Sequence, residues 1–201
     1  MSILILVRHG QSIYNSENRF TGSLDVDLTE FGKQEAKIAG LKLIDFKFDF
    51  AYTSTLKRAQ ESLQIILLEM HQTKIKVIEN EALNERNYGN LQGLNKDETI
   101  NKFGAKQVAI WRRSYAICPP EGESLEDTFN RTIPFYKLEI EPKLKLNTTI
   151  LIVAHGNSLR ALVMHLENIS KEEIPNLNIP TGVPKKYIFD ENLNVLENKY
   201  L

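Results

Sequence analysis

Ile3-Leu4-Ile5-Leu6-Val7-Arg8-His9-Gly10 is the stretch of sequence that decides the fold of this chain. Its apolar residues form an unbroken run without polar alternation, the pattern of a strand buried on both faces of a parallel sheet. The run then changes abruptly to a cation, an imidazole and a glycine. In open α/β sheets, ligands bind beyond the carboxyl ends of the strands. The stretch therefore predicts a buried strand that brings Arg8, His9 and Gly10 to a ligand-binding edge.

Outward from this strand, apolar and amphipathic segments alternate along the chain. The patterns predict strands at 48–53, 76–78, 149–154, 186–189 and 195–197, and helices at 29–43, from Ser54 or Thr55 to about 70, at 124–144, and from Asn157 or Ser158 to 166. Pro134 is expected to kink the 124–144 helix or to mark an irregular turn. The segment 84–114 mixes glycine-containing loop with helical patches.

This alternation predicts an α/β fold, a three-layer sandwich in which helices flank a mainly parallel central sheet. The length of 201 residues suits one domain over 1–201, and the chain has no internal repeat or low-complexity linker.

Composition excludes several classes of function. The chain has 25 Lys and Arg against 26 Asp and Glu, so no global basic field favours nucleic acid or an anionic membrane, and any anion site must be local. The apolar run near the start is too short for a membrane span or a signal-peptide core. The single cysteine, Cys118, excludes an intramolecular disulfide and a Cys-rich zinc site. We therefore expect a cytoplasmic protein.

Cations and imidazoles also follow the other long predicted strands. Arg58 lies just after 48–53, and His155, Gly156 and Asn157 follow 149–154. Arginine binds phosphate oxygens through a planar, bidentate fork, and the helices that begin after these strands add free N–H groups. Together with the residues after the first strand, these groups predict a site for a phosphate monoester.

His9 is the candidate phosphoryl acceptor. An imidazole has an unperturbed pKa of about 6.5 and is largely neutral at pH 7, so neither a metal nor a deprotonating base is required. One ring nitrogen must face phosphorus while the N–H of the other is tied to an acceptor. A tight turn at Gly10 is our hypothesis for the source of that acceptor, a backbone carbonyl.

Competing chemistries find little support. The chain lacks the Gly-x-x-x-x-Gly-Lys-Ser/Thr loop, and no arginine follows Cys118 to hold a phosphate on a thiolate, as a cysteine phosphatase requires. Asp25 and Asp27 lie close enough to suggest a metal, but no further ligands cluster with them, so an exposed turn is the preferred interpretation. We predict a metal-independent enzyme.

Longer strings around these residues resemble a known family. Leu6 to Gly10 followed by Gln11-Ser12 is similar to the signature of the histidine phosphatase superfamily, and 154–157 resembles its second histidine motif. More specific strings resemble the cofactor-dependent phosphoglycerate mutases, a likeness that runs from 3 to 201. They are NRFTG at 18–22, LNERNYG at 83–89, LQGLNK at 91–96, WRRSY at 111–115 and NIPTGVP at 178–184.

The resemblance implies a reaction and a set of roles. The reaction would be interconversion of 3-phosphoglycerate and 2-phosphoglycerate, in glycolysis and gluconeogenesis, through a phosphohistidine primed by 2,3-bisphosphoglycerate. His9 would take the phosphoryl group, Arg8, Arg58 and His155 would hold its oxygens, and Glu85 would act as general acid and base. The implied substrate contacts are Ser12, Asn15, Thr21, Gly22, Tyr88, Lys96, Arg112, Arg113, Gly156 and Asn157.

Two alternatives stay open at this point. Many mutases of the family carry an insertion before the Ser124 helix and a polar tail beyond position 201, and this sequence has neither. A phosphohistidine-type phosphatase acting on small phosphorylated metabolites would use the same residues with better access for water. A non-catalytic module that binds such metabolites is the third interpretation. The missing insertion also leaves open whether the protein is a monomer or a homodimer.

Overall fold

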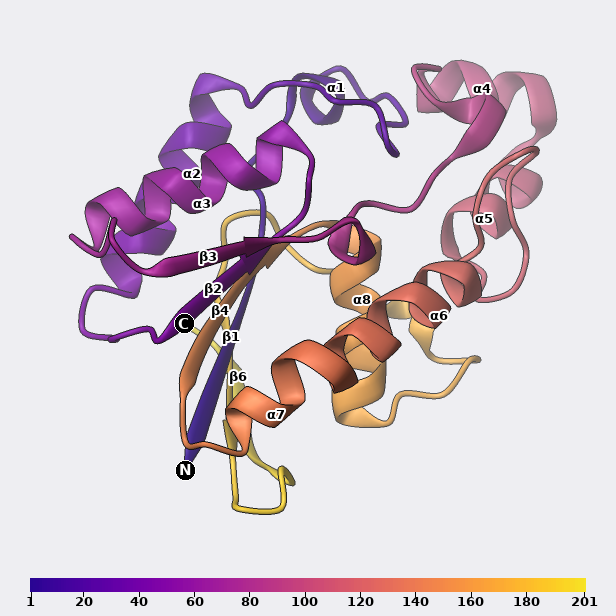
Figure 1. The fold of residues 1–201 in the computed structure, drawn as a ribbon. Helices are drawn as coiled ribbons and strands as arrows, with labels where there is room; N and C mark the ends of the chain where they lie inside the picture. The colour runs from indigo at the N-terminus through magenta and orange to yellow at the C-terminus, as the bar shows by residue number, and fades with distance from the viewer.

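A mixed six-stranded sheet forms the centre of the computed structural model, which describes residues 1–201 (Figure 1). Its strands are β1 (Ser2–Arg8), β2 (Phe50–Thr53), β3 (Lys76–Glu79), β4 (Thr149–Ala154), β5 (Lys185–Phe189) and β6 (Val195–Tyr200), in the order β3-β2-β4-β1-β5-β6. The pairs among β3, β2, β4 and β1 are parallel, whereas β5 and β6 add an antiparallel edge. The predicted mainly parallel sheet is confirmed.

Helices cover both faces of this sheet (Figure 1). One face carries α2 (Glu30–Lys42) and α3 (Lys57–Glu69), and the other carries α6 (Leu125–Phe135), α7 (Glu141–Leu144) and α8 (Gly156–Glu167). The predicted three-layer sandwich is therefore confirmed.

The unbroken apolar run of β1 serves two separate cores. Leu4 and Leu6 pack in a cluster with residues of α8 and the α6–α7 region, while Ile5 and Val7 pack in a cluster with residues of α2 and α3. All four side chains are at most 2% exposed. Because successive side chains of a strand point to opposite faces, a strand between two helical layers needs apolar residues at every position.

Helix α2 begins as predicted and α3 does not. Thr29 caps α2, where its hydroxyl accepts the Gly32 N–H at 3.0 Å. The expected caps of α3, Ser54 and Thr55, were wrong, because α3 begins at Lys57. The Asp25 carboxylate accepts the Lys57 N–H at 2.8 Å from outside the helix.

Of the two remaining long helices, α6 begins with the predicted cap and α8 does not. Ser124 and Asp127 form the predicted capping box at the start of α6, with N–H to side-chain distances of 2.9 and 3.0 Å. Pro134 lies inside α6, and an irregular π-helical turn, Tyr136–Ile140, leads from there into α7. The predicted caps of α8, Asn157 and Ser158, were wrong, because α8 already begins at Gly156.

The remaining helices lie beyond one end of the sheet, on the side opposite the N-terminus (Figure 1). They are α1 (Ile13–Ser16), α4 (Lys96–Phe103) and α5 (Ala105–Arg113). Short 3₁₀ turns at Glu81–Leu83 and Gly89–Leu91 precede α4. The predicted mixture of loop and helix in 84–114 is confirmed.

Two glycines join α2 to the loop after β1. A Cβ added to Gly32 would overlap the Gln11 carbonyl oxygen, and one added to Gly10 would overlap the carbonyl oxygen of Gly32. Only residues without a side chain permit this backbone approach, which sets α2 directly against the loop that contains His9.

Replacing Gly32 with alanine tests this contact. Gly to Ala in a helix interior ordinarily stabilises by roughly 0.5–1 kcal/mol through helix propensity. Here we expect Gly32→Ala to lower the free energy of unfolding by about 1–3 kcal/mol, because backbone must move to admit the methyl group. Urea unfolding measures the change, with Gln34→Ala at an exposed position of the same helix as control. Unchanged or increased stability of Gly32→Ala would contradict the proposed contact.

Candidate active site

The carboxyl ends of β1, β2 and β4 meet at one cavity of about 150 Å³. The strand register places Val7 and Thr53 on either side of Val153, so the residues that follow these strands converge. Every predicted site residue lines this cavity except Ser12 and His155. The predicted residues that line it are Arg8, His9, Asn15, Thr21, Gly22, Arg58, Glu85, Tyr88, Lys96, Arg112, Arg113, Gly156 and Asn157.

Ser12 and His155 lie behind the cavity wall. Both are fully buried. The Ser12 hydroxyl accepts the Asn15 N–H at 3.3 Å and thereby caps α1. The His155 ring contacts the His9 ring edge-on, with centroids 4.9 Å apart, and its Nε2 pairs with the Ser54 hydroxyl at 2.7 Å. The predicted contact of Ser12 with substrate stays a prediction, and in this structure its hydroxyl caps the helix that Ser12 precedes.

The contacts of His9 determine its tautomer. Its Nδ1 lies 2.6 Å from the Gly10 carbonyl oxygen, which can only accept, so Nδ1 carries the proton. Its Nε2 accepts a hydrogen bond of 3.4 Å from Nε of Arg58, which can only donate, so Nε2 is the unprotonated ring nitrogen. The arrangement matches the hypothesis of a backbone carbonyl at Gly10. It leaves His9 Nε2 as the ring nitrogen that could act as a nucleophile at the cavity wall.

Both histidines are held neutral. Burial, together with the nearby charges of Arg58 and Arg8, lowers the pKa of His9 well below its usual value of 6.5. Burial and the Arg58 charge lower the pKa of His155 well below 6.5 in the same way. Since a protonated imidazole has no free lone pair, this environment favours the form of His9 that can attack phosphorus.

Arg58 is fixed by the loop that follows α1. Its two terminal nitrogens donate to the Leu24 and Gly22 carbonyl oxygens, both at 2.7 Å, and the side chain is fully buried. Burial lowers the pKa of Arg58 to about 10, so the group remains a cation at neutral pH. Arg58 therefore presents a rigid positive charge directly beside His9 Nε2.

A second loop closes over Arg8. One terminal nitrogen of Arg8 donates to the Ile179 carbonyl oxygen at 2.9 Å, and the Gly182 N–H donates to the Arg8 carbonyl oxygen at 2.9 Å. The carboxylate of Glu35, on α2, accepts from the Thr181 hydroxyl and from the Gln11 N–H. Glu35 thus joins this loop to the loop that contains His9.

Glu85 supplies the only carboxylate in the cavity wall. Its Oε1 accepts the Arg86 N–H at 2.9 Å and the Asn157 N–H at 3.0 Å. Asn157 lies in the first turn of α8, where unpaired N–H groups and the helix dipole favour a negative charge. The carboxylate is therefore held at a defined place at the start of this helix.

Positive charge far exceeds negative charge in this cavity. Seven Lys and Arg side chains line it against one carboxylate, and of the seven only Arg19 forms an ion pair, with Glu17 at 2.7 Å. Lys96 begins α4, while Arg112 and Arg113 end α5. Burial lowers the pKa of Lys96, and the charge of Arg112 adds to this effect. Such a concentration of cations suits a ligand with several negative charges.

Sequence reasoning missed several cavity residues. They are Arg19, Phe20, Arg160, Asn178 and Ile179. Arg160 was detectable in principle, because it lies three residues after Asn157 and therefore on the same face of a helix. Its terminal nitrogen donates to the Asn157 side-chain oxygen at 2.9 Å. Phe20, Arg19, Asn178 and Ile179 lie within strings that carried the family resemblance.

Unpartnered donors gather around the same cavity. Three buried side-chain atoms of cavity-lining residues, Arg8 Nε, Thr21 Oγ1 and Arg160 Nε, have no hydrogen-bond partner within the protein. Buried polar groups are ordinarily satisfied, so these donors suit a ligand rich in acceptor oxygens.

Two negative observations complete the description. None of the helices combines the length and apolar composition that a bilayer span requires. No three His, Cys, Asp or Glu side chains form a group suited to holding a metal ion. Asp25, considered above as a metal ligand, instead accepts the N–H at the start of α3.

Comparisons with known proteins all find relatives that act on phosphorylated compounds. A family model described as Histidine phosphatase superfamily (branch 1) matches residues 4–198. A protein of Cytophaga hutchinsonii named 2,3-bisphosphoglycerate-dependent phosphoglycerate mutase is 55% identical over 201 residues, which cover 100% of this chain and 94% of that protein. A protein of the same name from Bartonella bacilliformis is 54% identical, covering 98% of this chain and 97% of that one. A solved mycobacterial glucosyl-3-phosphoglycerate phosphatase superposes with a TM-score of 0.83 at 25% identity, covering 100% and 98%.

The two buried neutral histidines make stability depend on pH. Because their folded pKa values lie below 6.5, the unfolded chain binds more protons in mildly acidic solution, and the free energy of unfolding falls as the pH drops below 6.5. The slope reaches up to about 1.4 kcal/mol per pH unit for each histidine. Urea unfolding between about pH 5 and pH 7 measures it.

Two variants separate the contribution of these histidines. His155→Asn is expected to reduce the slope, and His165→Asn, whose half-buried ring also has a lowered pKa, is expected to reduce it less. A flat wild-type profile over this pH range would contradict the assignment of two neutral buried histidines.

Proposed function

This chain belongs to the histidine phosphatase superfamily (branch 1), and on that premise we propose that it interconverts 3-phosphoglycerate and 2-phosphoglycerate through a phosphohistidine on His9, primed by 2,3-bisphosphoglycerate. The observation that carries the proposal is the cavity of seven cations and one carboxylate built around His9 Nε2. The proposal takes 1–201 as one catalytic domain that acts in glycolysis and gluconeogenesis in the cytoplasm, without a metal.

The charges of the cavity fit 2,3-bisphosphoglycerate. Each phosphate carries about −1.5 to −2 at neutral pH, and the carboxylate adds one further negative charge. Arg8 and Arg58 stand beside His9 to hold one phosphate, while Lys96, Arg112 and Arg113 can hold the groups at the other end. When bound, this cofactor supplies the phosphoryl group that charges His9. The unpartnered donors described above offer acceptor oxygens several further hydrogen bonds.

His9 accepts and returns the phosphoryl group. As the bond from His9 Nε2 to phosphorus forms, the bond from phosphorus to the ester oxygen breaks, and the leaving oxygen takes a proton. The Nδ1–H bond to the Gly10 carbonyl keeps the ring oriented throughout. Arg58 and Arg8 stabilise the charge that spreads over the phosphoryl oxygens in the transition state, since they are already in place beside Nε2.

Glu85 moves the proton in both directions. A protonated Glu85 gives its proton to the leaving ester oxygen, and the ionised carboxylate takes a proton from the hydroxyl that attacks phospho-His9. The hydrogen bonds from the Arg86 and Asn157 N–H groups hold one carboxylate oxygen, which leaves the other for the substrate. An enzyme that runs in both directions can therefore use one group as acid and base.

Hydrolysis is the second candidate function, supported by the likeness to a solved phosphatase. It would use the same residues and differ only in whether water reaches phospho-His9 before a phosphoglycerate does. The short chain does not favour hydrolysis, because relatives named as mutases align with it over nearly their whole length. A non-catalytic binding module is disfavoured, because it would not need His9, Glu85 and His155 together.

A product assay distinguishes the two reactions. With 3-phosphoglycerate and catalytic 2,3-bisphosphoglycerate, we expect 2-phosphoglycerate to form at least about ten times faster than inorganic phosphate, since the cations favour a phosphoglycerate over water at phospho-His9. An absorbance assay coupled to enolase measures 2-phosphoglycerate, and a phosphate assay on the same samples measures inorganic phosphate. Phosphate release without 2-phosphoglycerate would overturn the mutase proposal and establish the phosphatase.

Removing the nucleophile tests the intermediate. His9→Asn keeps a donor for the Gly10 carbonyl but has no nucleophilic nitrogen, so we expect turnover to fall by a factor on the order of 10⁴ or more. Acid-labile label from ³²P-bisphosphoglycerate should disappear with the activity. His71→Asn, exposed and distant from any cavity residue in sequence, is the control. Retention of acid-labile label by His9→Asn would show that another residue is phosphorylated.

A further inference from the structure

The segment that contains Glu85 has little regular structure of its own. It runs from the end of β3 through the 3₁₀ turn Glu81–Leu83 to Tyr88, with no strand or α-helix. Its residues are nevertheless ordered against α6, whose Thr132 hydroxyl donates to the Ala82 carbonyl oxygen at 2.9 Å. A carboxylate that must act as acid and base needs a fixed position, and within this segment only the Arg86 N–H bonds to the Glu85 carboxylate.

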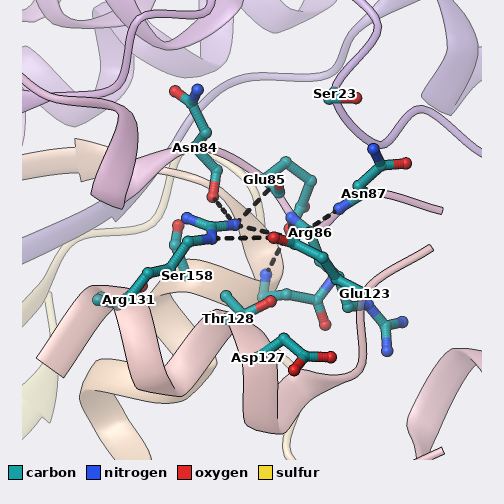
Figure 2. A network of polar contacts seen from close by, with 12 residues as sticks. Ser23, Asn84, Glu85, Arg86, Asn87, Glu123, Asp127, Thr128, Arg131 and Ser158 are labelled. Atoms are coloured by element: carbon teal, nitrogen blue, oxygen red, sulfur yellow. Dashed lines mark hydrogen bonds and ion pairs between the residues drawn. The ribbon is translucent and has the colours of Figure 1, made fainter. Parts of the chain in front are cut away.

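A single guanidinium, that of Arg131 on α6, supplies most of the missing order (Figure 2). One terminal nitrogen donates to the Glu81 and Ala82 carbonyl oxygens, at 3.3 and 2.9 Å, and the other donates to the Asn84 and Glu85 carbonyl oxygens, at 3.0 and 3.2 Å. Four carbonyls of the segment therefore point toward one cation.

Glu123 completes the arrangement from the loop before α6. Its carboxylate accepts from Nε and a terminal nitrogen of Arg131, at 3.3 and 3.2 Å. The same carboxylate accepts the Asn87 N–H at 2.9 Å, and the Glu123 N–H donates to the Asn87 carbonyl oxygen at 2.8 Å. Glu85 is thus held on both sides along the chain. Arg131 binds the carbonyl oxygens up to that of Glu85, and Glu123 binds the backbone of Asn87, two residues further on.

We propose that Arg131 and Glu123, which line no part of the cavity around His9, are positioning residues that hold the Glu85 carboxylate in register with His9. The inference rests on the proposed role of Glu85 as acid and base. Arg131 holds the Glu85 backbone from one side, while the Asn157 N–H of α8 holds its carboxylate from the other. Since a displacement of about 1 Å can cost a factor of about 100 in rate, such a frame has a direct effect on catalysis.

A purely stabilising role does not explain this geometry. The Arg131 and Glu123 side chains are 25% and 30% exposed, and ion pairs of this kind contribute little to folding stability. The guanidinium instead serves as a planar template, because its rigid fork can meet several carbonyl oxygens at once. A lysine would keep the charge but offers a compact ammonium on a flexible stem, so it cannot reproduce this set of bonds.

A double-mutant cycle tests the proposal. Arg131→Lys is expected to lower kcat for 2-phosphoglycerate formation by about 10- to 100-fold with KM changed less than about threefold, because the substrate-binding cations stay in place. In a Glu85→Gln background the same substitution should cost less than about twofold, since the group that Arg131 positions is already lost. Steady-state kinetics of the four proteins measure the coupling.

Two further variants make the test sharper. Glu123→Gln keeps acceptor oxygen for Arg131 and Asn87 but removes the charge, so its kcat should lie between those of wild type and Arg131→Lys. Lys171→Ala removes an exposed ion pair of 3.4 Å between Lys171 and Glu126, which lies on α6 as Arg131 does, and should leave kcat unchanged. Thermal unfolding of each variant identifies any loss that follows from unfolding, and Glu123→Gln then carries the cycle if Arg131→Lys does not fold.

Several results would overturn the inference. Equal losses from Arg131→Lys with and without Glu85 would show a general structural role, and a raised KM with unchanged kcat would show a role in substrate binding. The proposed function fails separately, if wild-type protein makes no 2-phosphoglycerate. The cycle can then be read on hydrolysis of 3-phosphoglycerate, because a phosphatase also needs Glu85 to protonate the leaving oxygen.

Discussion

The rest of the active site depends on one electrostatic constraint, the gathering of positive charge around a single carboxylate at the end of the sheet. Isolated buried charges are costly, and six of the seven cavity cations have no acidic partner. Backbone carbonyls take the place of acids, as those of Gly22 and Leu24 do for Arg58. Carbonyl oxygens fix the orientation of a guanidinium without neutralising its charge. The site therefore retains its attraction for a polyanion while its cations stay ordered.

Hydrogen bonds from guanidinium groups to backbone carbonyls also hold parts of the chain that have no regular structure. Arg8 is joined to the loop at 179–182 through the Ile179 carbonyl, and Arg131 orders the segment before Glu85 through four carbonyls. In each case a side chain on a regular element holds the backbone of a loop. The sheet and its helices thus determine the geometry of loop residues, which explains how a site assembled from distant segments can be precise.

The sequence was sufficient for the sheet and for the cavity residues that follow β1, β2 and β4, because both follow from local rules, whereas the other predicted cavity residues came from the family resemblance. Unbroken apolar runs identify doubly buried strands, and the residues after their carboxyl ends must share one edge, as Arg8 and Asn157 do. The predicted cap of α3 failed because the Ser54 hydroxyl is bonded elsewhere, to His155 Nε2 and to the Leu56 N–H, and α3 begins only at Lys57. Arg131 was not found for a similar reason, since its acceptors are backbone carbonyls some 50 residues away, which no side-chain pattern reveals.

In the proposed reaction, the neutral state of His9 explains why one carboxylate is enough. A nucleophile that must first be deprotonated needs a base of its own, as a serine does, whereas His9 keeps its Nε2 lone pair because burial and two arginines disfavour protonation. The only proton left to manage is that of the substrate hydroxyl. Attack and departure of that oxygen are the same step in opposite directions, so the group that takes the proton must also return it. The proposed reversible transfer therefore needs Glu85 to be held equally well in both directions, and the hydrogen bonds from α6 and α8 are the proposed means of holding it.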